Sequence, residues 1–363
     1  MDDAQALRRG WTTGACATAA AKAAAAALLT GAFPDPVEIT LPGGKRAAFA
    51  LAETLRDADA ATAGVVKDAG DDPDVTHGAL VRATVRRAPA GVGVRFHAGP
   101  GVGTVTRPGL PVPPGEPAIN PIPRAMIGTA LAEVGLPDAD VTVAIRDGEK
   151  LAARTLNPRL GIVGGLSVLG TTGIVVPYSC AAWIAGIRQG IDVARAAGLA
   201  HIAGATGRAS EAAVRALHGL PEIALIDMGD FVGGMLKHLR AHPIPRVTIA
   251  GGVGKMTKLA QGLLDLHSKR GEVSFAALAD FAREAGAAED VVHAVAQANT
   301  AAHAFMLAGD VKLGDVVAAR AWQTAASVLD DAPIALEVVL FDRSGAIAGR
   351  AGFAPAHARN RRR

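Results

Sequence analysis

Apolar and polar positions follow two different rhythms along the chain, and the change comes near residue 157. Before it, short runs in which apolar and polar residues alternate are typical of strands with one buried face. A long alanine-rich run and a second apolar repeat predict helices at residues 14–30 and 124–136. Strands are expected within residues 36–41, 46–55, 78–88, 91–99 and 140–155. The sequence PGG and the pair Asp147-Gly148 predict hairpin turns.

After residue 157, a short apolar strand is followed by a glycine-rich loop and a helix, and this unit recurs four times. Such alternation is typical of a parallel, doubly wound sheet with right-handed crossovers. Helices are then expected over residues 274–329, and another hairpin over 334–352. The four loops read LGTTG (169–173), GATGR (204–208), DMGD (227–230) and GGVGK (251–255).

The two rhythms predict two domains, one α+β and one α/β. The apolar pattern of the C-terminal hairpin resembles that of residues 140–155, so we expect the chain end to return to the first domain. The prediction is therefore a Rossmann-like α/β domain of residues 156–332, inserted into an α+β domain made of residues 1–155 and 333–363.

Composition narrows the function classes. Aromatic residues make up only 4% of the chain, so platforms that stack nucleic-acid bases are not expected. The 37 basic and 34 acidic residues are interspersed, and the one basic block, RNRRR at residues 359–363, is interpreted as a tail. We predict no nucleic-acid partner. The sequence leaves open whether the chain is a monomer or a homo-oligomer.

The cysteine content and the uncharged segments of the chain bear on its cellular location. Two cysteines, Cys16 and Cys180, do not make a disulfide framework, and residues 1–10 lack the apolar core of a signal peptide. Residues 160–187 carry no charge and are longer than the ~20 residues that a bilayer requires. Their six glycines and one proline predict strand, loop and helix instead of a membrane span. We expect a cytoplasmic protein without a membrane partner.

Ligands of an open parallel sheet bind beyond the carboxyl ends of its strands, where all four glycine loops are expected. Glycine lets a ligand approach the backbone, and the following helix offers free N–H groups to an anion. Asp230 and Lys255 are polar candidates there, with a surface ion pair as the alternative. Neither GxxxxGK[ST] nor GxGxxG is complete, because Ile249 and Met256 break the former, so an NAD-linked oxidoreductase is disfavoured.

The segment KDAGDDPDVTHG brings Asp71, Asp72, Asp74 and His77 within seven residues. A divalent metal site, an acid/base or substrate-binding site, and a turn whose carboxylates cap backbone N–H groups all fit this spacing. The three interpretations stay open at this point.

The start of the first helix, TTGAC, raises a similar choice. Thr12, Thr13 and Gly14 stand where hydroxyls and uncapped N–H groups favour an anion, whereas the plain alternative makes Thr13 the helix N-cap. Cys16 in the first turn is expected to have a somewhat lowered pKa and a packing role.

In chain order, these motifs resemble those of the CbiD family, the cobalt-precorrin-5B (C1)-methyltransferases of cobalamin biosynthesis. The resemblance covers nearly the whole chain. Trp11 and Ala209 depart from the family's usual residues. The motifs are RGWTTGACA, KDAGDDPDVTHG, RPGLPVPPGEPAINPIPR, NPRLGIVGGLSVLGTTGIVVPYS, TGRASE, MGDFVG and GKMTKLAQG.

The resemblance implies methyl transfer from S-adenosylmethionine to carbon 1 of cobalt-precorrin-5B, giving cobalt-precorrin-6A. It implies a corrin substrate whose carboxylates are held by Thr12, Thr13, Gly14, Arg124 and Arg208. Any cobalt would come with the substrate, and no protein-bound metal is expected. The residues then assigned to S-adenosylmethionine are Gly170, Thr171, Thr172, Gly173, Gly204, Gly207, Asp230, Gly251 and Lys255.

His77 is the candidate that exchanges a proton with the ring, because its ordinary pKa lies near neutrality, and Asp74 is the candidate that orients it. The competing function class is a non-catalytic tetrapyrrole- or nucleotide-binding protein that uses the same loops.

Overall fold

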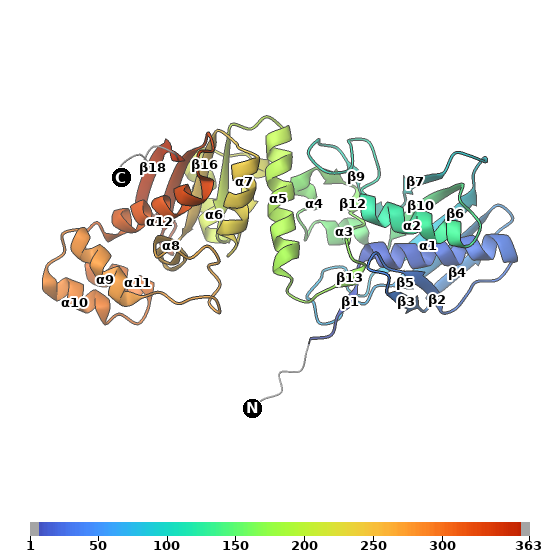
Figure 1. Cartoon of the computed structure of the whole chain (residues 1–363), viewed down its shortest axis with the longest axis horizontal. Helices are drawn as coiled ribbons and strands as arrows, with labels where there is room; N and C mark the ends of the chain where they lie inside the picture. Colours follow the sequence, from blue (N-terminus) through green and yellow to red (C-terminus); the bar gives the residue numbers. More distant parts are fainter. Residues whose placement is uncertain (1–6, 357–363) are drawn as a thin grey trace, which may run out of the picture. The chain divides into compact units, whose positions relative to one another are not determined.

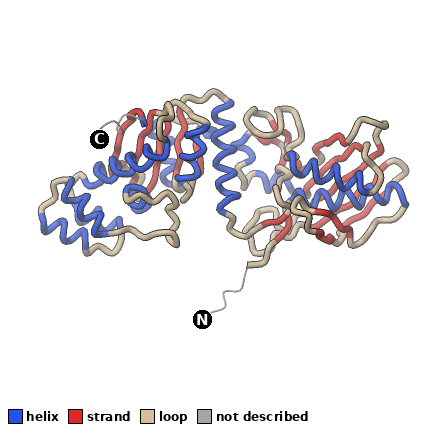
Figure 2. Tube along the Cα trace, in the orientation of Figure 1, coloured by secondary structure: helices blue, strands red, loops and turns tan. Residues whose placement is uncertain are grey.

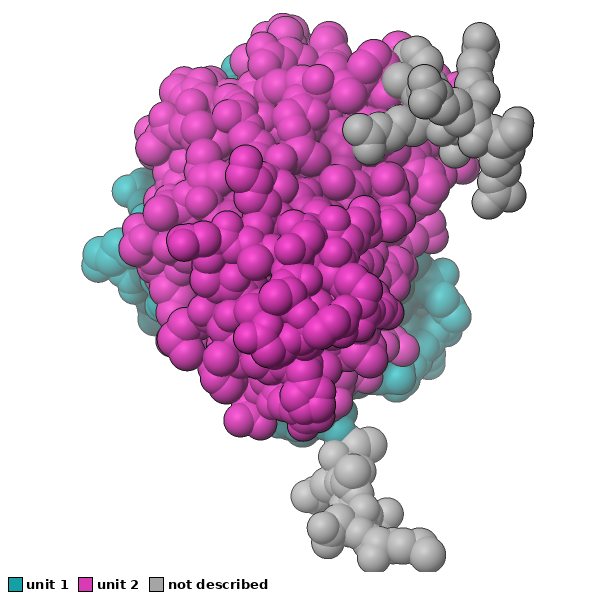
Figure 3. All heavy atoms as spheres, turned by 90° about the vertical axis from the view of Figure 1, so that its left-hand side faces the viewer, with its two compact units in different colours: residues 1–180 teal, residues 181–363 magenta. Residues whose placement is uncertain are grey.

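A five-stranded sheet forms the centre of residues 1–180 in the computed structural model, which describes residues 7–356 (Figures 1 and 2). All neighbouring strands are antiparallel except the last pair, which is parallel. The chain divides into two compact units, residues 1–180 and 181–363, which Figure 3 colours separately. In spatial order the strands of the first sheet are β4 (Glu53–Arg56), β5 (Ala60–Val66), β6 (Leu80–Arg87), β10 (Ala139–Ile145) and β7 (Val94–Ala98).

Helix α1 (Thr13–Thr30) packs against β5 and β6 and against α2 (Pro121–Glu133). Alanine at most of its positions lets the helix axis lie close to the sheet, and Gly31 ends it in the left-handed conformation. By length and composition α1 is apolar enough to cross a membrane, but 78% of it is buried inside the structure. It is therefore the core helix of this unit.

Four two-stranded pairings complete the first unit. The predicted hairpin of residues 36–55 is confirmed as β2 and β3. In contrast, residues 162–175, which were expected to begin the α/β domain, pair with strands of the first unit, so that expectation is wrong. The pairs are β2 (Val37–Thr40) with β3 (Arg46–Phe49), β1 (Gly10–Trp11) with β13 (Ile174–Val175), β8 (Gly101–Val102) with β12 (Gly165–Leu166), and β9 (Thr104–Val105) with β11 (Ile162–Val163).

The predicted hairpin turn at Asp147-Gly148 is also wrong, because the short helix α3 (Gly148–Ala152) begins there and α4 (Asn157–Leu160) follows. Glycine is needed at position 148 for packing: a Cβ there would lie 2.2 Å from the carbonyl oxygen of Gly101. Asp147 has the positive φ of 56°, which aspartate tolerates better than most residues.

The second unit has a sheet in the order β15-β14-β16-β17-β18, in which only the last strand is antiparallel to its neighbour. The predicted parallel sheet is thus confirmed for residues 201–341, and the rejected membrane span is confirmed as short strands, loop and helix. The strands are β14 (His201–Ala205), β15 (Leu225–Asp227), β16 (Arg246–Gly252), β17 (Ala335–Phe341) and β18 (Ile347–Pro355). The helices are α5 (Cys180–Ala196), α6 (Arg208–His218), α7 (Val232–Ala241), α8 (Val253–Ala260), α9 (Phe275–Glu284), α10 (Glu289–Ala296), α11 (Ala301–Ala308) and α12 (Leu313–Leu329), with a 3-10 turn at Glu222–Ala224.

The C-terminal hairpin does not return to the first domain, and the prediction of an inserted α/β domain is wrong on this point. Strand β17 pairs in parallel with β16 over seven residues. Its side chains are buried on both faces, as in a strand inside a parallel sheet, whereas β10 alternates buried and half-buried positions. Residues 140–155 and 334–352 share a similar order of apolar residues, which did not distinguish a strand buried on one face from a strand buried on both. The basic tail lies outside the described residues.

A buried polar cluster ties these strands together. Glu337 of β17 is 0% exposed, and its carboxylate accepts hydrogen bonds from Thr248 at 2.8 Å and His218 at 2.6 Å. Arg350 of β18 donates two more, at 2.8 and 2.6 Å. A buried carboxylate needs this full set of donors, since an unpaired charge there would strongly destabilise the fold.

His201 borders this cluster and bonds to Thr248 at 2.9 Å. Burial, followed by the charges of His218 and Arg246, lowers the pKa of His201 from 6.5 to about 4. The unfolded chain therefore binds more protons than the folded chain between these two pH values.

We accordingly predict that the free energy of unfolding falls as the pH drops from about 6.5 to about 4. The slope due to His201 stays below ~1.4 kcal/mol per pH unit, because one imidazole takes up at most one proton on unfolding. Urea unfolding of the His201→Phe variant across this range should give a flatter profile. His293→Phe, which changes an exposed histidine of α10, is the control, and an unchanged slope in His201→Phe would contradict the assignment.

Candidate functional site

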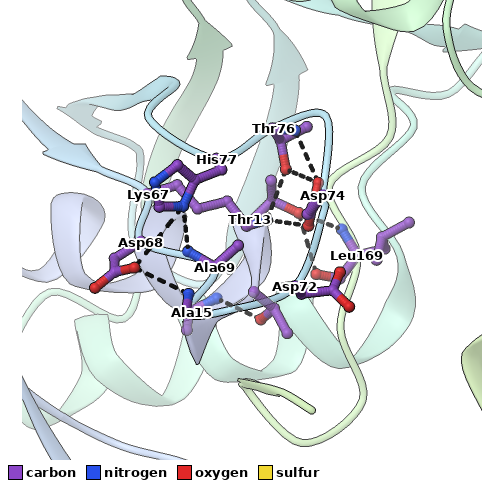
Figure 4. A network of polar contacts seen from close by, with 12 residues as sticks. Thr13, Ala15, Lys67, Asp68, Ala69, Asp72, Asp74, Thr76, His77 and Leu169 are labelled. Atoms are coloured by element: carbon purple, nitrogen blue, oxygen red, sulfur yellow. Dashed lines mark hydrogen bonds and ion pairs between the residues drawn. The ribbon is translucent and has the colours of Figure 1, made fainter. Parts of the chain in front are cut away.

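The loop that follows β5 folds around a buried lysine (Figure 4). Lys67 is 2% exposed, and its ammonium group donates to the Asp74 carboxylate and, at 2.6 Å, to the Thr76 hydroxyl. Asp74 also accepts hydrogen bonds from the Thr76 N–H at 2.8 Å and the Thr76 hydroxyl at 2.6 Å. Burial by itself would raise the pKa of Asp74, but Lys67 and Thr76 together hold it below its usual range.

His77 stands apart from the Asp74 carboxylate, so the predicted orientation of His77 by the Asp74 side chain is wrong. Only the backbone carbonyl of Asp74 contacts it, accepting the His77 N–H at 3.0 Å. The carboxylate beside the ring is Asp68, 3.8 Å from Nδ1, and Nδ1 accepts the Ala69 N–H at 3.1 Å. The neutral ring therefore carries its proton on Nε2, and the side chain is 53% exposed.

Asp68 is itself held in the charged form. The Arg8 guanidinium, followed by the N–H of Gly70, lowers the pKa of Asp68 to about 2. Arg8 also donates its backbone N–H to Asp71 at 2.6 Å, and Asp72 accepts the N–H of Tyr178 at 2.8 Å. Asp71 and Asp72 thus cap N–H groups of distant segments, whereas Asp74 caps the local N–H of Thr76, as the turn interpretation expects. Among residues 7–356, no group of three or more histidine, cysteine, aspartate or glutamate side chains is placed to hold a metal ion.

The start of α1 is occupied by the chain itself. Thr12, not the predicted Thr13, is the N-cap, and its hydroxyl accepts the Ala15 N–H at 3.1 Å. Thr13 bonds through its hydroxyl to the backbone of Leu169 at 3.2 Å, and the Gly14 N–H donates to the Leu169 carbonyl at 3.0 Å. The groups predicted to bind an anion are therefore hydrogen-bonded to Leu169, at the start of the 169–173 loop.

That loop belongs to the first unit, so the prediction that Gly170, Thr171, Thr172 and Gly173 line the edge of the α/β sheet is wrong. A Cβ at position 170 would lie 2.4 Å from Thr12, and Gly170 and Gly173 both have positive φ. The Thr172 hydroxyl bonds to the backbone of Ile174 at 3.2 Å. Glycine at 170 and 173 is accounted for by backbone conformation and close packing.

Cys16 is buried one turn further into α1, and burial raises its pKa to about 12. The expected lowering is wrong, because desolvation outweighs the nearby Lys67 charge. Arg124 is engaged as well: it donates to the backbone carbonyls of Ile119 at 2.8 Å and Pro117 at 3.0 Å, and to Glu116 at 3.2 Å.

In the second unit, the structure does bring predicted residues together, at the carboxyl ends of β14, β15 and β16. The Lys255 ammonium donates to the carbonyl oxygen of Thr206 at 2.8 Å and lies 3.1 Å from a carboxylate oxygen of Asp230. It thereby links the GATGR loop with the DMGD loop. The sheet order changes direction between β14 and β16, which is where ligands of such sheets bind.

The glycines of this edge differ in their surroundings. A Cβ at Gly204 would lie 2.3 Å from the sulfur of Met235, and one at Gly251 would lie 2.7 Å from Met256, so both serve packing. A Cβ at Gly207 would meet nothing within 4 Å. Gly207 is also the N-cap of α6, followed directly by the exposed Arg208.

Each unit has an open pocket on its own surface. Arg208 lies in a pocket of about 580 Å³ along α6, together with Arg215 and Leu225. The pocket of the first unit, about 560 Å³, lies on the sheet and includes Thr142 and Arg146.

The comparisons with known proteins assign the chain to a family. Residues 1–177 match the CbiD model, and residues 265–352 match that of the CbiD C-terminal domain. A cobalt-precorrin-5B C(1)-methyltransferase of Agrobacterium fabrum is 62% identical over 359 residues, which cover 98% of this chain and 96% of the relative. The chain belongs to the CbiD family.

A second methyltransferase relative fits this assignment. The enzyme of the same name from Bradyrhizobium sp. is 62% identical over 351 residues, covering 95% of this chain and 93% of the relative. The crystal structure of the cobalamin biosynthesis protein cbiD from Archaeoglobus fulgidus is 27% identical, covers 73% of this chain and 83% of its own, and has a TM-score of 0.39. The resemblance drawn from the sequence motifs is confirmed.

For this CbiD chain, sequence reasoning missed Lys67 and Asp68. Both stand at the start of the segment KDAGDDPDVTHG, directly after an apolar strand, which was the one signal that the sequence offered. Asp68, rather than Asp74, is the carboxylate beside His77.

We predict that Lys67→Met lowers the free energy of unfolding by about 2 kcal/mol or more, because the partly buried Asp74 carboxylate loses its partner. Lys150→Met breaks an exposed ion pair and should cost less than about 0.5 kcal/mol. Chemical denaturation of both variants checks this, and equal losses would contradict the structural importance of the buried pair.

Proposed function

We propose that this chain is a cobalt-precorrin-5B C(1)-methyltransferase of cobalamin biosynthesis, and that S-adenosylmethionine is its methyl donor. One observation carries the proposal: a protein of this name matches the chain at 62% identity over 98% of its length. The product is cobalt-precorrin-6A. A direct test supplies cobalt-precorrin-5B and methyl-labelled S-adenosylmethionine and follows the label into the corrin. Absence of labelled product with a folded protein would contradict the proposal.

The chemistry places modest demands on the protein. The carbon–sulfur bond of the sulfonium breaks, its electron pair stays on sulfur to give S-adenosylhomocysteine, and ring carbon 1 forms the new carbon–carbon bond. Because the donor is already activated, alignment of the two reacting carbons is the main contribution, with proton exchange at the ring as the second.

The donor is proposed to bind in the second unit, at the edge formed by the loops after β14, β15 and β16. Support comes from the open space at Gly207 and from the link that Lys255 makes between Thr206 and Asp230. It comes also from the order of the parallel strands, since β15 and β16 lie on opposite sides of β14. Gly204 and Gly251 support this edge by packing.

The substrate carries carboxylates, for which Arg208 is the best-supported contact, since it is exposed in an open pocket beside Arg215. A substrate carboxylate would have to replace hydrogen bonds that the protein already makes in order to bind Arg124, Thr13 or Gly14. No resident metal is proposed: cobalt belongs to the substrate. The proposed location is the cytoplasm.

The donor site predicts the effect of filling the space at Gly207. Gly207→Val should raise the dissociation constant of S-adenosylhomocysteine about tenfold, the loss of about 1.4 kcal/mol expected when a backbone hydrogen bond is blocked. Gly352→Val is the control, because position 352 is equally open but lies in β18. Calorimetric titration measures both variants. Unchanged affinity in Gly207→Val would contradict this donor site.

His77 is proposed to exchange a proton with the corrin through its exposed Nε2. His77→Ala should then lower turnover by ~100-fold or more, without changing the affinity for S-adenosylhomocysteine. A purely structural His77 gives a different result, a loss of ~1–3 kcal/mol in stability with nearly normal turnover per folded molecule. Turnover and melting temperature measured on the same variant separate the two.

A further inference from the structure

Trp183, near the start of α5, lies against the loop that follows β15. Its indole N–H donates to the carbonyl oxygen of Asp227 at 3.1 Å. A Cβ at Gly229 would lie 3.3 Å from three atoms of the indole, so the ring covers this glycine. The Phe231 ring lies 6.4 Å away, centre to centre.

These contacts bring the indole to the edge of the sheet proposed to hold the donor. The N–H groups of Met228 and Gly229 both donate to the carbonyl oxygen of Ala205, at 3.1 and 3.2 Å, which joins the loop after β15 to the last residue of β14. Asp230, next along the chain, forms the ion pair with Lys255.

Helix α5 holds the ring in place within the second unit. Ile184 packs beside Gly234 of α7, since a Cβ at 234 would lie 3.1 Å from it, and Gly190 packs in the same way on Ile226. Asp192 accepts a hydrogen bond from His238 at 2.7 Å. The helix is therefore fixed on α7 and β15, and the position of Trp183 at the sheet edge follows from it.

Trp183 is nevertheless 49% exposed, whereas Trp322 is 2% exposed. Since the indole N–H already has a partner, the surface that remains for a ligand is the apolar ring system. Aromatic residues make up only 4% of this chain, so a half-exposed indole beside a glycine loop is a distinctive feature.

We propose that the Trp183 ring stacks on the adenine ring of S-adenosylmethionine, an inference that rests on the proposed function. A planar base matches a planar, exposed indole face. In sheets of this kind, an acidic residue at the end of the second strand binds the ribose of a nucleotide, and Asp227, the last residue of β15, stands at that place. The base then lies beyond the ribose, on the side of Trp183.

Tryptophan fluorescence of the full chain tests this assignment. The chain has three tryptophans, of which Trp183 is the half-exposed one at this edge. S-adenosylhomocysteine and adenosine should both quench the emission, while homocysteine should not. Trp183→Phe should abolish the quenching. Trp11→Phe, which changes a ring packed on Phe49 in the first unit, should retain it.

Affinity gives the second measurement. Trp183→Ala should raise the dissociation constant of S-adenosylhomocysteine about tenfold, within the range that base–aromatic stacking provides, and Trp183→Phe by less than about threefold. If Trp183→Ala fails to fold, the quenching data on wild type, Trp183→Phe and Trp11→Phe decide the question alone.

The possible results distinguish a failure of the Trp183 stacking contact from a failure of the proposed methyltransferase function. Wild-type binding of S-adenosylhomocysteine with unchanged affinity in both Trp183 variants would overturn the stacking contact and leave the methyltransferase proposal standing. Quenching by homocysteine but not by adenosine would overturn the assignment to adenine. Self-association that Trp183→Ala abolishes, without any adenosine effect, would make the ring a protein contact and overturn it too. No binding by the wild type would overturn the donor site itself.

Discussion

The contact among three glycine backbones, at positions 101, 148 and 165, determines how the middle of the chain is divided. A Cβ at Gly148 or Gly165 would lie 2.2 or 2.3 Å from the carbonyl oxygen of Gly101, so only glycine permits this approach. It pairs β12 with β8 and brings residues 162–175 into the first unit. A chain that is rich in small residues can stabilise such contacts because close packing replaces large side chains.

The consequences reach the start of α1. Once β12 is in place, the 169–173 loop lies on the first turn of the helix and occupies the N–H of Gly14 and the hydroxyl of Thr13. Nearby, the buried pair of Lys67 and Asp74 shapes the loop that presents His77. The first unit thus offers an exposed imidazole next to an anion, Asp68, while the second unit offers open glycine loops joined by Lys255.

Sequence reasoning was strongest where one local pattern decides the structure. The alternation of strands, glycine loops and helices predicted the parallel sheet of the second unit, and the PGG turn predicted the β2–β3 hairpin. It failed where distant segments meet. Nothing local shows that Gly165 faces Gly101, or that β17, with both faces buried, pairs with β16 and not with the first sheet.

The same division holds for the candidate site. Lys255 and Asp230 were found because they follow strand ends, and the structure brings them together as the ion pair that was the alternative to a ligand contact. The pairing of His77 with Asp68 and of Lys67 with Asp74 depends on how one loop folds back on itself. The sequence therefore suggested Asp74, and not Asp68, as the carboxylate beside His77. The sequence did not indicate Trp183 as a site residue, because its place at the sheet edge depends on its contact with Gly229, 46 positions further along the chain.

The proposed donor site lies at the loops of the second unit and not at the 169–173 loop. Hydrogen–deuterium exchange of the whole chain, with and without S-adenosylhomocysteine, distinguishes the two locations. Exchange should slow in residues 204–210 and 227–231 and stay unchanged in residues 169–173. Protection confined to residues 8–16 and 167–175 would contradict the proposed site.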